Sequence, residues 1–322
     1  MSSRLRGLLV CVSSCFLSLS AMAQSWPSQP VKIVVPTPAG SSVDIVARVI
    51  GEKLTPMLGQ PVIVENRPGA GGTIGTDAVA KARDGHTLLM GYNGPLTVAP
   101  SLYPKLPYDL AKDFAPVILV VTQPNVLAVR SDLKVNNIKE LVALAKAKPG
   151  QLDYASVGNG SLSHLAMEML KMYTNTYIVH IPFNGGPPAA QALNGGEVHM
   201  AFAALSNLQP LVKAGKVKLI AVSNGRRSVA APMVPTVAEQ GFPGFDATTW
   251  NGVLVPSNTP REVILKLNKA IGQILALPDV QARLLAAGAE SAGSTPEQFG
   301  ALMKSELAAW PAVVKRSGAK LD

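Results

Sequence analysis

The chain has 322 residues, of which 48% are hydrophobic and 15% are charged. This length allows two domains with sizeable cores, and this composition excludes a largely disordered chain. The net charge is +9, but Lys and Arg are scattered singly, without the basic blocks and interleaved aromatic residues typical of nucleic-acid binding. We therefore expect no nucleic-acid partner.

Residues 1–23 have the pattern of a cleaved secretory signal peptide. Arg4 and Arg6 precede an apolar run that is short for a membrane-spanning helix, and the segment ends in the small-x-small sequence Ala-Met-Ala at 21–23. No later apolar run reaches spanning length. We therefore expect export from the cytoplasm, with cleavage after Ala23 and a mature start at Gln24.

The cysteines Cys11 and Cys15 both lie in this signal segment. The mature chain is then expected to form no disulfide and to use no thiol for catalysis or metal binding. A lipoprotein remains an alternative, because the residues before Cys15 loosely fit a lipid-attachment site.

Further along the chain, apolar β-branched runs alternate with helical patterns. This alternation predicts an α/β fold with buried, parallel-type strands. Three helical patterns close the chain, and the last ends near Lys315. Strands are predicted over 31–36, 61–66, 86–92, 114–129 with a break at Pro124, 152–157, 177–183, 198–204, 217–223 and 251–256, with helices over 42–58, 73–82, 137–150 and after Ser161.

The layout predicts two α/β lobes. One is assigned to residues 24–122 plus 250–322, and the other to residues 123–249. The chain would cross between them near Gln123-Pro124 and again near Trp250. Two lobes joined by extended crossings are typical of a hinged protein with a cleft between them.

Four predicted strands end in loops of small residues that open helices: PTPAGSSVD (36–44), ENRPGAGGTIG (65–75), SVGNGSLSH (156–164) and PFNGGPPAA (182–190). Each loop alone has a structural explanation, since Ser41 and Ser161 fit helix N-caps and Pro187 fits a first helical turn. Ligands bind at the carboxyl ends of strands in open α/β sheets. Together the four loops predict a cleft rich in backbone N–H donors.

Enzymatic alternatives have weaker support. Gly69, Gly71 and Gly75 lack the dinucleotide-loop spacing, and the following strand ends in Asn93 rather than an acidic residue. Ser161 and His164 could serve a hydrolase, but the nucleophile-elbow motif and an orienting acid are not evident. We expect no catalytic residue, no cofactor and no metal, with the Ser161 hydrolase kept as an alternative.

Eight segments, in order, resemble the Bug family, the extracytoplasmic substrate-binding receptors of tripartite tricarboxylate transporters. They are WPSQPVKIVVPTPAGSSVDIVAR, VIVENRPGAGGTIGTDAVAKARDGHTLL, LPYDLAKDFAPV, GNGSLSHLAMEML, VHIPFNGGPPAAQALNGGEVHMAF, VKAGKVKLIAVS, VPTVAEQGFPGF and, after Trp250, GVLVPSNTP. The resemblance implies a two-lobed type II periplasmic binding fold, or Venus flytrap, without catalysis. It also implies a periplasmic location and a ligand held by backbone N–H groups and bridging waters.

The resemblance also places ligand-binding residues on this sequence. It implies that Asp44 contacts a ligand amino or hydroxyl group. Two departures stand out: Thr37 replaces a usual aromatic residue, and Ala39-Gly40-Ser41 replaces a usual Pro-Gly-Gly. The implied residues are Thr37, Ala39, Gly40, Ser41, Ser42, Asp44, Gly71, Tyr92, Asn93, Thr97, Gly158, Asn159, Gly160, Ser161, Ser163, His164, Phe183, Asn184, Gly185 and Gly186.

We expect the protein to capture a small carboxylate, which could be a di- or tricarboxylate, an acidic amino acid or an aromatic acid. Its expected partners are integral membrane subunits of a tripartite transporter, and we expect a monomer. A sensory receptor that presents its ligand to a membrane kinase remains an alternative, because both roles would use the closed form.

Overall fold

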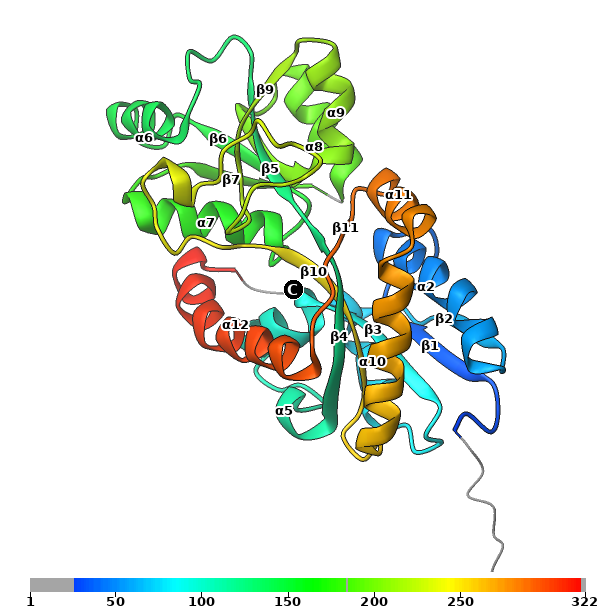
Figure 1. Ribbon diagram of the computed structural model, residues 1–322. Coiled ribbons are helices and arrows are strands. Elements are labelled where there is room, and N and C mark those ends of the chain that lie inside the picture. The colour runs from blue at the N-terminus through cyan, green and yellow to red at the C-terminus, as the bar shows by residue number, and fades with distance from the viewer. Residues whose placement is uncertain (1–25, 184, 320–322) are drawn as a thin grey trace, which may run out of the picture.

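The protein folds into two lobes, each built around its own β-sheet (Figure 1). The computed structural model describes residues 26–183 and 185–319. The predicted signal peptide, with its cleavage site and both cysteines, therefore lies outside the described residues, as does Asn184. The chain leaves the first sheet through β4 (Phe114–Gln123) and returns to it through β10 (Thr249–Pro256).

The first-lobe sheet has the strand order β11-β4-β10-β3-β1-β2. Strands β1, β2 and β3 are parallel, whereas β10 runs antiparallel to both β3 and β4. The prediction of parallel-type strands was thus wrong for this part, because the chain leaves through one strand and returns through its neighbour. The other bounds are β1 (Val31–Val35), β2 (Val62–Asn66), β3 (Thr87–Tyr92) and β11 (Glu290–Ser291).

The second-lobe sheet has the order β7-β6-β8-β5-β9, and β5 runs antiparallel to both of its neighbours. The stretch 114–129 is therefore two strands in different sheets. They part at Pro124, which has no N–H to continue a ladder. The bounds are β5 (Asn125–Arg130), β6 (Asp153–Ser156), β7 (Val179–Pro182), β8 (Met200–Ala204) and β9 (Val217–Val222).

Helices cover both sheets, and the two predicted N-caps are confirmed. The Ser41 side chain accepts a hydrogen bond from the Asp44 N–H, and the Ser161 side chain accepts one from the His164 N–H.

Within residues 26–183 and 185–319, no helix has the length and apolarity to cross a bilayer. The helices are α2 (Ser42–Leu58), α3 (Thr73–Ala80), α4 (Ala99–Leu102), α5 (Leu110–Asp113), α6 (Ile138–Ala147), α7 (Leu162–Thr174), α8 (Gly186–Gly195), α9 (Leu205–Lys213), α10 (Arg261–Leu275), α11 (Pro278–Ala286) and α12 (Pro296–Ser317), with short turns η1 (Ala70–Gly72), η2 (Gly94–Val98) and η3 (Ala238–Gln240).

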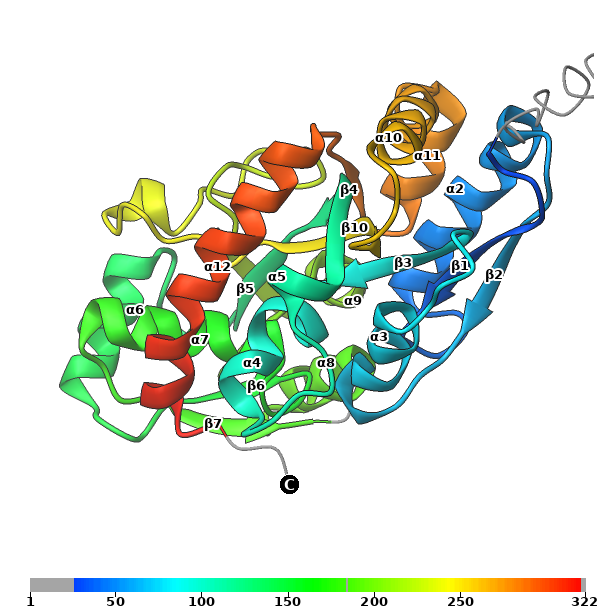
Figure 2. The same cartoon turned by 90° about the horizontal axis from the view of Figure 1, so that it is seen from below.

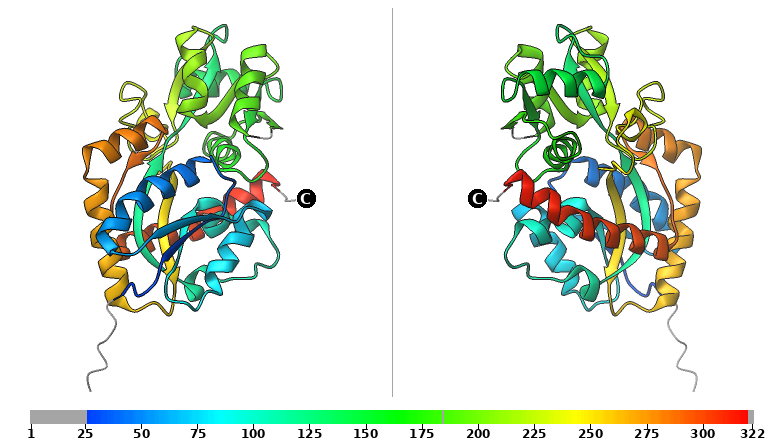
Figure 3. Two further views of the ribbon diagram at one scale, coloured as in Figure 1. Left: turned by 90° about the vertical axis from the view of Figure 1, so that its right-hand side faces the viewer. Right: turned by 90° about the vertical axis from the view of Figure 1, so that its left-hand side faces the viewer.

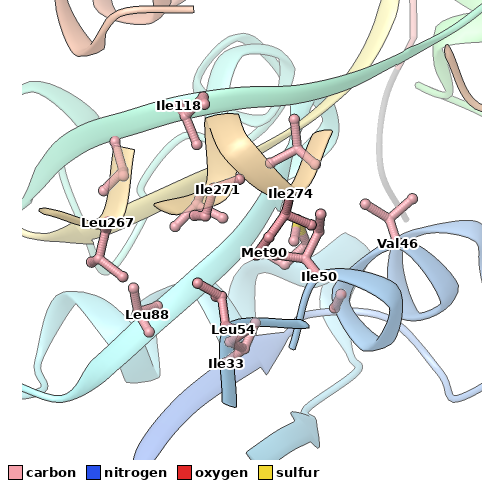
Figure 4. Close-up of a cluster of buried hydrophobic side chains, with 14 of the residues drawn as sticks. Ile33, Val46, Ile50, Leu54, Leu88, Met90, Ile118, Leu267, Ile271 and Ile274 are labelled. Carbon is pink, nitrogen blue, oxygen red and sulfur yellow. The ribbon is translucent and has the colours of Figure 1, made fainter. Parts of the chain in front are cut away.

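The core of the first lobe lies between its sheet and the neighbouring helices α2 and α10 (Figure 4). Each helix turns an apolar stripe, spaced three to four residues apart, toward the strands. This packing fixes the positions of the strand ends that carry the loops predicted to form the cleft. The side chains drawn there include Val46, Ile50 and Leu54 of α2, Leu267, Ile271 and Ile274 of α10, and Ile33, Leu88, Met90 and Ile118 of the sheet.

Helix α12 joins the two lobes. Phe299 and Met303 belong to a first-lobe core cluster, whereas Trp310, Val313 and Val314 pack in the second-lobe cluster with residues of α7. Figures 2 and 3 show α12 running from the first lobe toward α7. The segment assigned to the first lobe from the sequence therefore packs against both lobes.

Candidate functional site

A cavity of about 380 Å³ lies between the lobes, within the size range of small-molecule sites. Asn125 and Thr249 lie where the chain crosses between the sheets, and Asn125 Nδ2 donates to Thr249 Oγ1 at 3.0 Å. The cavity is thus formed by both lobes and by the crossing strands. It is lined by Gly71, Tyr92, Asn93, Gly94, Val98, Ala99, Leu102, Tyr103, Asn125, Val157, Gly158, Asn159, Gly160, Ser161, Leu162, Ser163 and Thr249.

The second-lobe side of the cavity is the 158–163 loop, which follows β6 and includes the first two residues of α7. Gly158 and Gly160 have φ values of 136° and 69°, which glycine adopts without strain. The Ser161 hydroxyl donates to the Gly158 carbonyl at 2.6 Å, which closes the turn. The N–H groups of Asn159, Leu162 and Ser163 have no acceptor among the described residues. The loop therefore brings unsatisfied donors, at the positive end of a helix dipole, to the cavity.

His164 lies behind this loop rather than in the cavity. It is 2% exposed, and its Nδ1 accepts a hydrogen bond from the Gly160 N–H at 3.1 Å. Its ring stacks on that of His180, whose Nε2 lies 2.6 Å from Ser156 Oγ. Burial lowers the pKa of both histidines to about 4, so both are neutral near pH 7. His164 supports the loop and does not serve as a base for Ser161, whose hydroxyl points to Gly158.

The first-lobe side carries two tyrosines. The Tyr92 hydroxyl donates to the Gly71 carbonyl at 2.8 Å, and the Tyr103 hydroxyl donates to the Ala70 carbonyl at 3.2 Å. Burial raises the pKa of Tyr92 to about 12, so it is neutral. Both hydroxyl protons are used inside the first lobe, and Val98, Ala99 and Leu102 extend this side with apolar side chains. We call Val98, Ala99, Leu102 and Tyr103 the apolar wall.

Asn93 lines the cavity, but its amide is engaged behind it. Asn93 Nδ2 donates to both carboxylate oxygens of Glu306 at 2.9 Å, and its Oδ1 accepts from the Trp250 N–H at 2.9 Å. Glu306 also accepts from Thr97 Oγ1 at 2.6 Å and from Trp250 Nε1 at 2.8 Å. Burial raises the pKa of Glu306, and these donors oppose that effect. Thr97 thus lies behind the cavity.

Glu306 was not predicted from the sequence, although a signal existed. Glu306 shares a helical stripe with Phe299, Met303 and Trp310, and a carboxylate on an apolar stripe needs buried donors. The apolar wall was not predicted either; its only signal was an apolar run after the strand that ends at Tyr92.

The 37–44 loop, at the end of β1, does not line this cavity. Asp44 is 2% exposed and accepts hydrogen bonds from Gly40 N at 2.9 Å, Arg48 Nε at 3.0 Å and Asn66 Nδ2 at 2.9 Å. Although burial opposes it, these donors hold the pKa of Asp44 below its usual value. Thr37 Oγ1 lies 2.6 Å from Ser41 Oγ, and this contact also shapes the loop.

The structure thus brings together part of the predicted set. The cavity does not include residues 37–44, Thr97, His164 or the described members of the PFNGG segment, Phe183, Gly185 and Gly186. The predicted residues that do line it are Gly71, Tyr92, Asn93, Gly158, Asn159, Gly160, Ser161 and Ser163.

Two α/β lobes joined by crossing strands, with a cavity of backbone donors between them, define a periplasmic-type solute-binding protein. The chain belongs to the family described as "Tripartite tricarboxylate transporter family receptor", whose sequence profile matches residues 46–319. Members of this family are periplasmic solute-binding receptors, and this chain is a receptor rather than an enzyme.

Individual relatives agree with this assignment. The chain is 37% identical to "Protein BugT" of Bordetella pertussis over 96% of each chain. It is 34% identical to "R. palustris Rpa4515 with adipate", covering 92% of this chain and all of that one, with a TM-score of 0.77. It is 35% identical to "MatC (Rpa3494) from Rhodopseudomonas palustris with bound malate", covering 90% and 100%, with a TM-score of 0.73. The predicted family and fold class are therefore confirmed.

Proposed function

We propose that this receptor captures a small carboxylate in the inter-lobe cavity and delivers it to membrane subunits of a tripartite transporter. The observation that carries the proposal is the 158–163 loop, where unsatisfied N–H donors meet the N-terminus of α7. Such an arrangement binds anions without a cationic side chain. Two similar proteins are described with adipate and with malate, which supports a carboxylate as the ligand class.

We further propose that lobe closure completes the site from the other side. The N–H groups of Ser42 and Val43, at the start of α2, also lack acceptors among the described residues. Closure would bring them toward the carboxylate held by the 158–163 loop, directly or through bridging waters. Asp44 would contribute by holding this loop in shape. The proposed first-lobe contributors are Thr37, Ala39, Gly40, Ser41, Ser42 and Asp44, and the second-lobe contributors beside the 158–163 loop are Phe183, Asn184, Gly185 and Gly186.

Calorimetry with a panel of carboxylic acids tests the ligand class. At least one acid should bind and raise the melting temperature, since a ligand at a hundred times its dissociation constant adds roughly 2.7 kcal/mol of stability. The methyl ester of that acid should bind much more weakly, because it carries no charge for the N–H dipoles. Equal affinity for acid and ester would contradict carboxylate recognition.

Export is the second element of the proposal. Mass spectrometry of the exported protein should find Gln24 at the N-terminus. A diacylglyceryl group on Cys15 would instead make the receptor a membrane-anchored lipoprotein.

Delivery to membrane subunits is the third element. Deleting the receptor gene should abolish uptake of the bound acid, and the purified receptor should elute as a monomer. Normal uptake together with a lost transcriptional response to the acid would favour the sensory role.

A further inference from the structure

The cavity is chemically divided. Its second-lobe side presents the backbone donors of the 158–163 loop, whereas its first-lobe side includes the apolar wall of Val98, Ala99, Leu102 and Tyr103. Val157, just before this loop, and Leu162, within it, add apolar side chains. A ligand that fills the cavity must therefore bury an apolar body as well as a polar group.

The polar side chains of Tyr92, Asn93 and Tyr103, on the first-lobe side of the cavity, are already hydrogen-bonded within the protein. The hydroxyl protons of Tyr92 and Tyr103 are donated to carbonyls of the 69–72 turn. Asn93 gives its amide protons to Glu306 and the Thr248 carbonyl. The side-chain donors of Tyr92, Asn93 and Tyr103 are thus occupied within the protein.

The charges around the cavity also disfavour a second anionic group on the ligand. Among the residues of the described chain that line it, none is Lys, Arg, His, Asp or Glu. A carboxyl group, that of Glu306, lies directly behind Asn93. A second ligand carboxylate against the apolar side chains of the wall would lose its hydration without gaining a hydrogen bond or a cation, which is strongly unfavourable.

We propose that the ligand is a monocarboxylate with an apolar body the size of an aromatic ring. Its carboxylate binds the 158–163 loop, and its body packs against the apolar wall. This inference rests on the proposed function, and it selects one class among the carboxylates. The Tyr103 ring adds a surface on which a flat ligand body can stack.

Calorimetry on the unmodified mature protein tests this with four probes: phenylacetate, succinate, citrate and benzyl alcohol. Phenylacetate should bind at least about tenfold more tightly than succinate or citrate, because only its body matches the apolar wall. Benzyl alcohol, which has the same ring but no carboxylate, should bind more weakly than phenylacetate.

The outcomes separate the two proposals. Succinate or citrate binding as tightly as phenylacetate, or more tightly, would overturn the monocarboxylate inference and leave carboxylate capture intact. Binding of benzyl alcohol as tight as that of phenylacetate, or no binding of any acid, would overturn carboxylate capture itself.

Tyr103→Ala provides a second test that localises the body. It should weaken phenylacetate binding about tenfold, since the loss of an aromatic contact surface has that scale. Tyr177→Ala is the matched control, because Tyr177 is 62% exposed and does not line the cavity. Equal phenylacetate affinities for the two variants, with folding verified by circular dichroism, would overturn the placement of the body.

Discussion

The imidazole rings of His164 and His180 are stacked, with centroids 3.9 Å apart and planes 6° from parallel. Tyr154 stacks on His180 from a neighbouring position, with centroids 4.9 Å apart. Glu168 accepts hydrogen bonds from Tyr154 Oη at 2.7 Å and Lys171 Nζ at 2.6 Å. This cluster lies directly behind the 158–163 loop, so its protonation state bears on the loop.

Stability should fall as pH drops from about 6.5 to about 4. Burial lowers the pKa of His164 and His180 from 6.5 to about 4, and the positive charge of Lys171 adds to the shift for both. In this window the unfolded histidines bind protons that the folded ones do not, so the free energy of unfolding rises with pH. Each histidine should contribute a slope of up to about 1.4 kcal/mol per pH unit.

Urea unfolding across this pH window measures the slope. His180→Gln keeps a hydrogen-bonding side chain but cannot titrate, so it should remove part of the slope. An unchanged slope in this variant would show that the stacked pair does not control the pH dependence.

Leu162→Pro should weaken ligand binding without unfolding α7. Leu162 is the first residue of the helix, where proline is tolerated, and Ser161 has φ −67° and ψ 156°, which suit a residue before proline. The variant removes one cavity-side N–H. A hydrogen bond to a charged group contributes about 1.5–3 kcal/mol, so the binding free energy should be weaker by that amount than in Leu162→Ala.

The alanine variant is the control, because it loses the same side chain and keeps the N–H. Calorimetry with whichever acid binds the unmodified protein gives the comparison. Equal affinities for the two variants would mean that the Leu162 N–H does not hold the ligand.

Glu306→Ala should lower the free energy of unfolding by roughly 2–4 kcal/mol. It leaves buried donors of Asn93, Thr97 and Trp250 without their acceptor, which is among the more unfavourable changes a core can undergo. Lys304→Ala, at an exposed position on the same helix, should have little effect. Thermal unfolding of both variants measures the difference, and similar melting temperatures would contradict the role of Glu306.

Trp310→Ala should loosen the junction between the lobes. Truncating a buried tryptophan costs about 3–5 kcal/mol, and Trp310 packs in the second-lobe cluster from a first-lobe helix. Hydrogen exchange in α7 should therefore accelerate. Phe299→Ala, in the first-lobe cluster, should accelerate exchange mainly near Trp250, its T-shaped partner at 5.1 Å. Identical exchange patterns in the two variants would contradict the separate roles of the two ends of α12.

Much of the fold could be predicted because its signals are local. The caps at Ser41 and Ser161 involve groups three residues apart, and the break at Pro124 follows from a missing N–H. The glycine loops at strand ends follow in the same way from the conformations that only glycine adopts easily. The order of eight family segments supplied the fold class and the receptor family.

Tertiary structure decided which groups meet. Glu306 lies 213 residues from Asn93 along the chain, and the apolar wall lines the same cavity as a loop from the other lobe. The direction of β10 depended on the return of the chain from the second lobe. The hydrogen bonding of the Asp44 carboxylate depends in part on Asn66, 22 residues away. Such contacts are set by the packing of distant elements against each other, which local propensity and spacing do not encode. The sequence by itself therefore determined the lobes, the caps and the donor-rich loops, and packing alone determined which of these loops share a cavity and what lies opposite them.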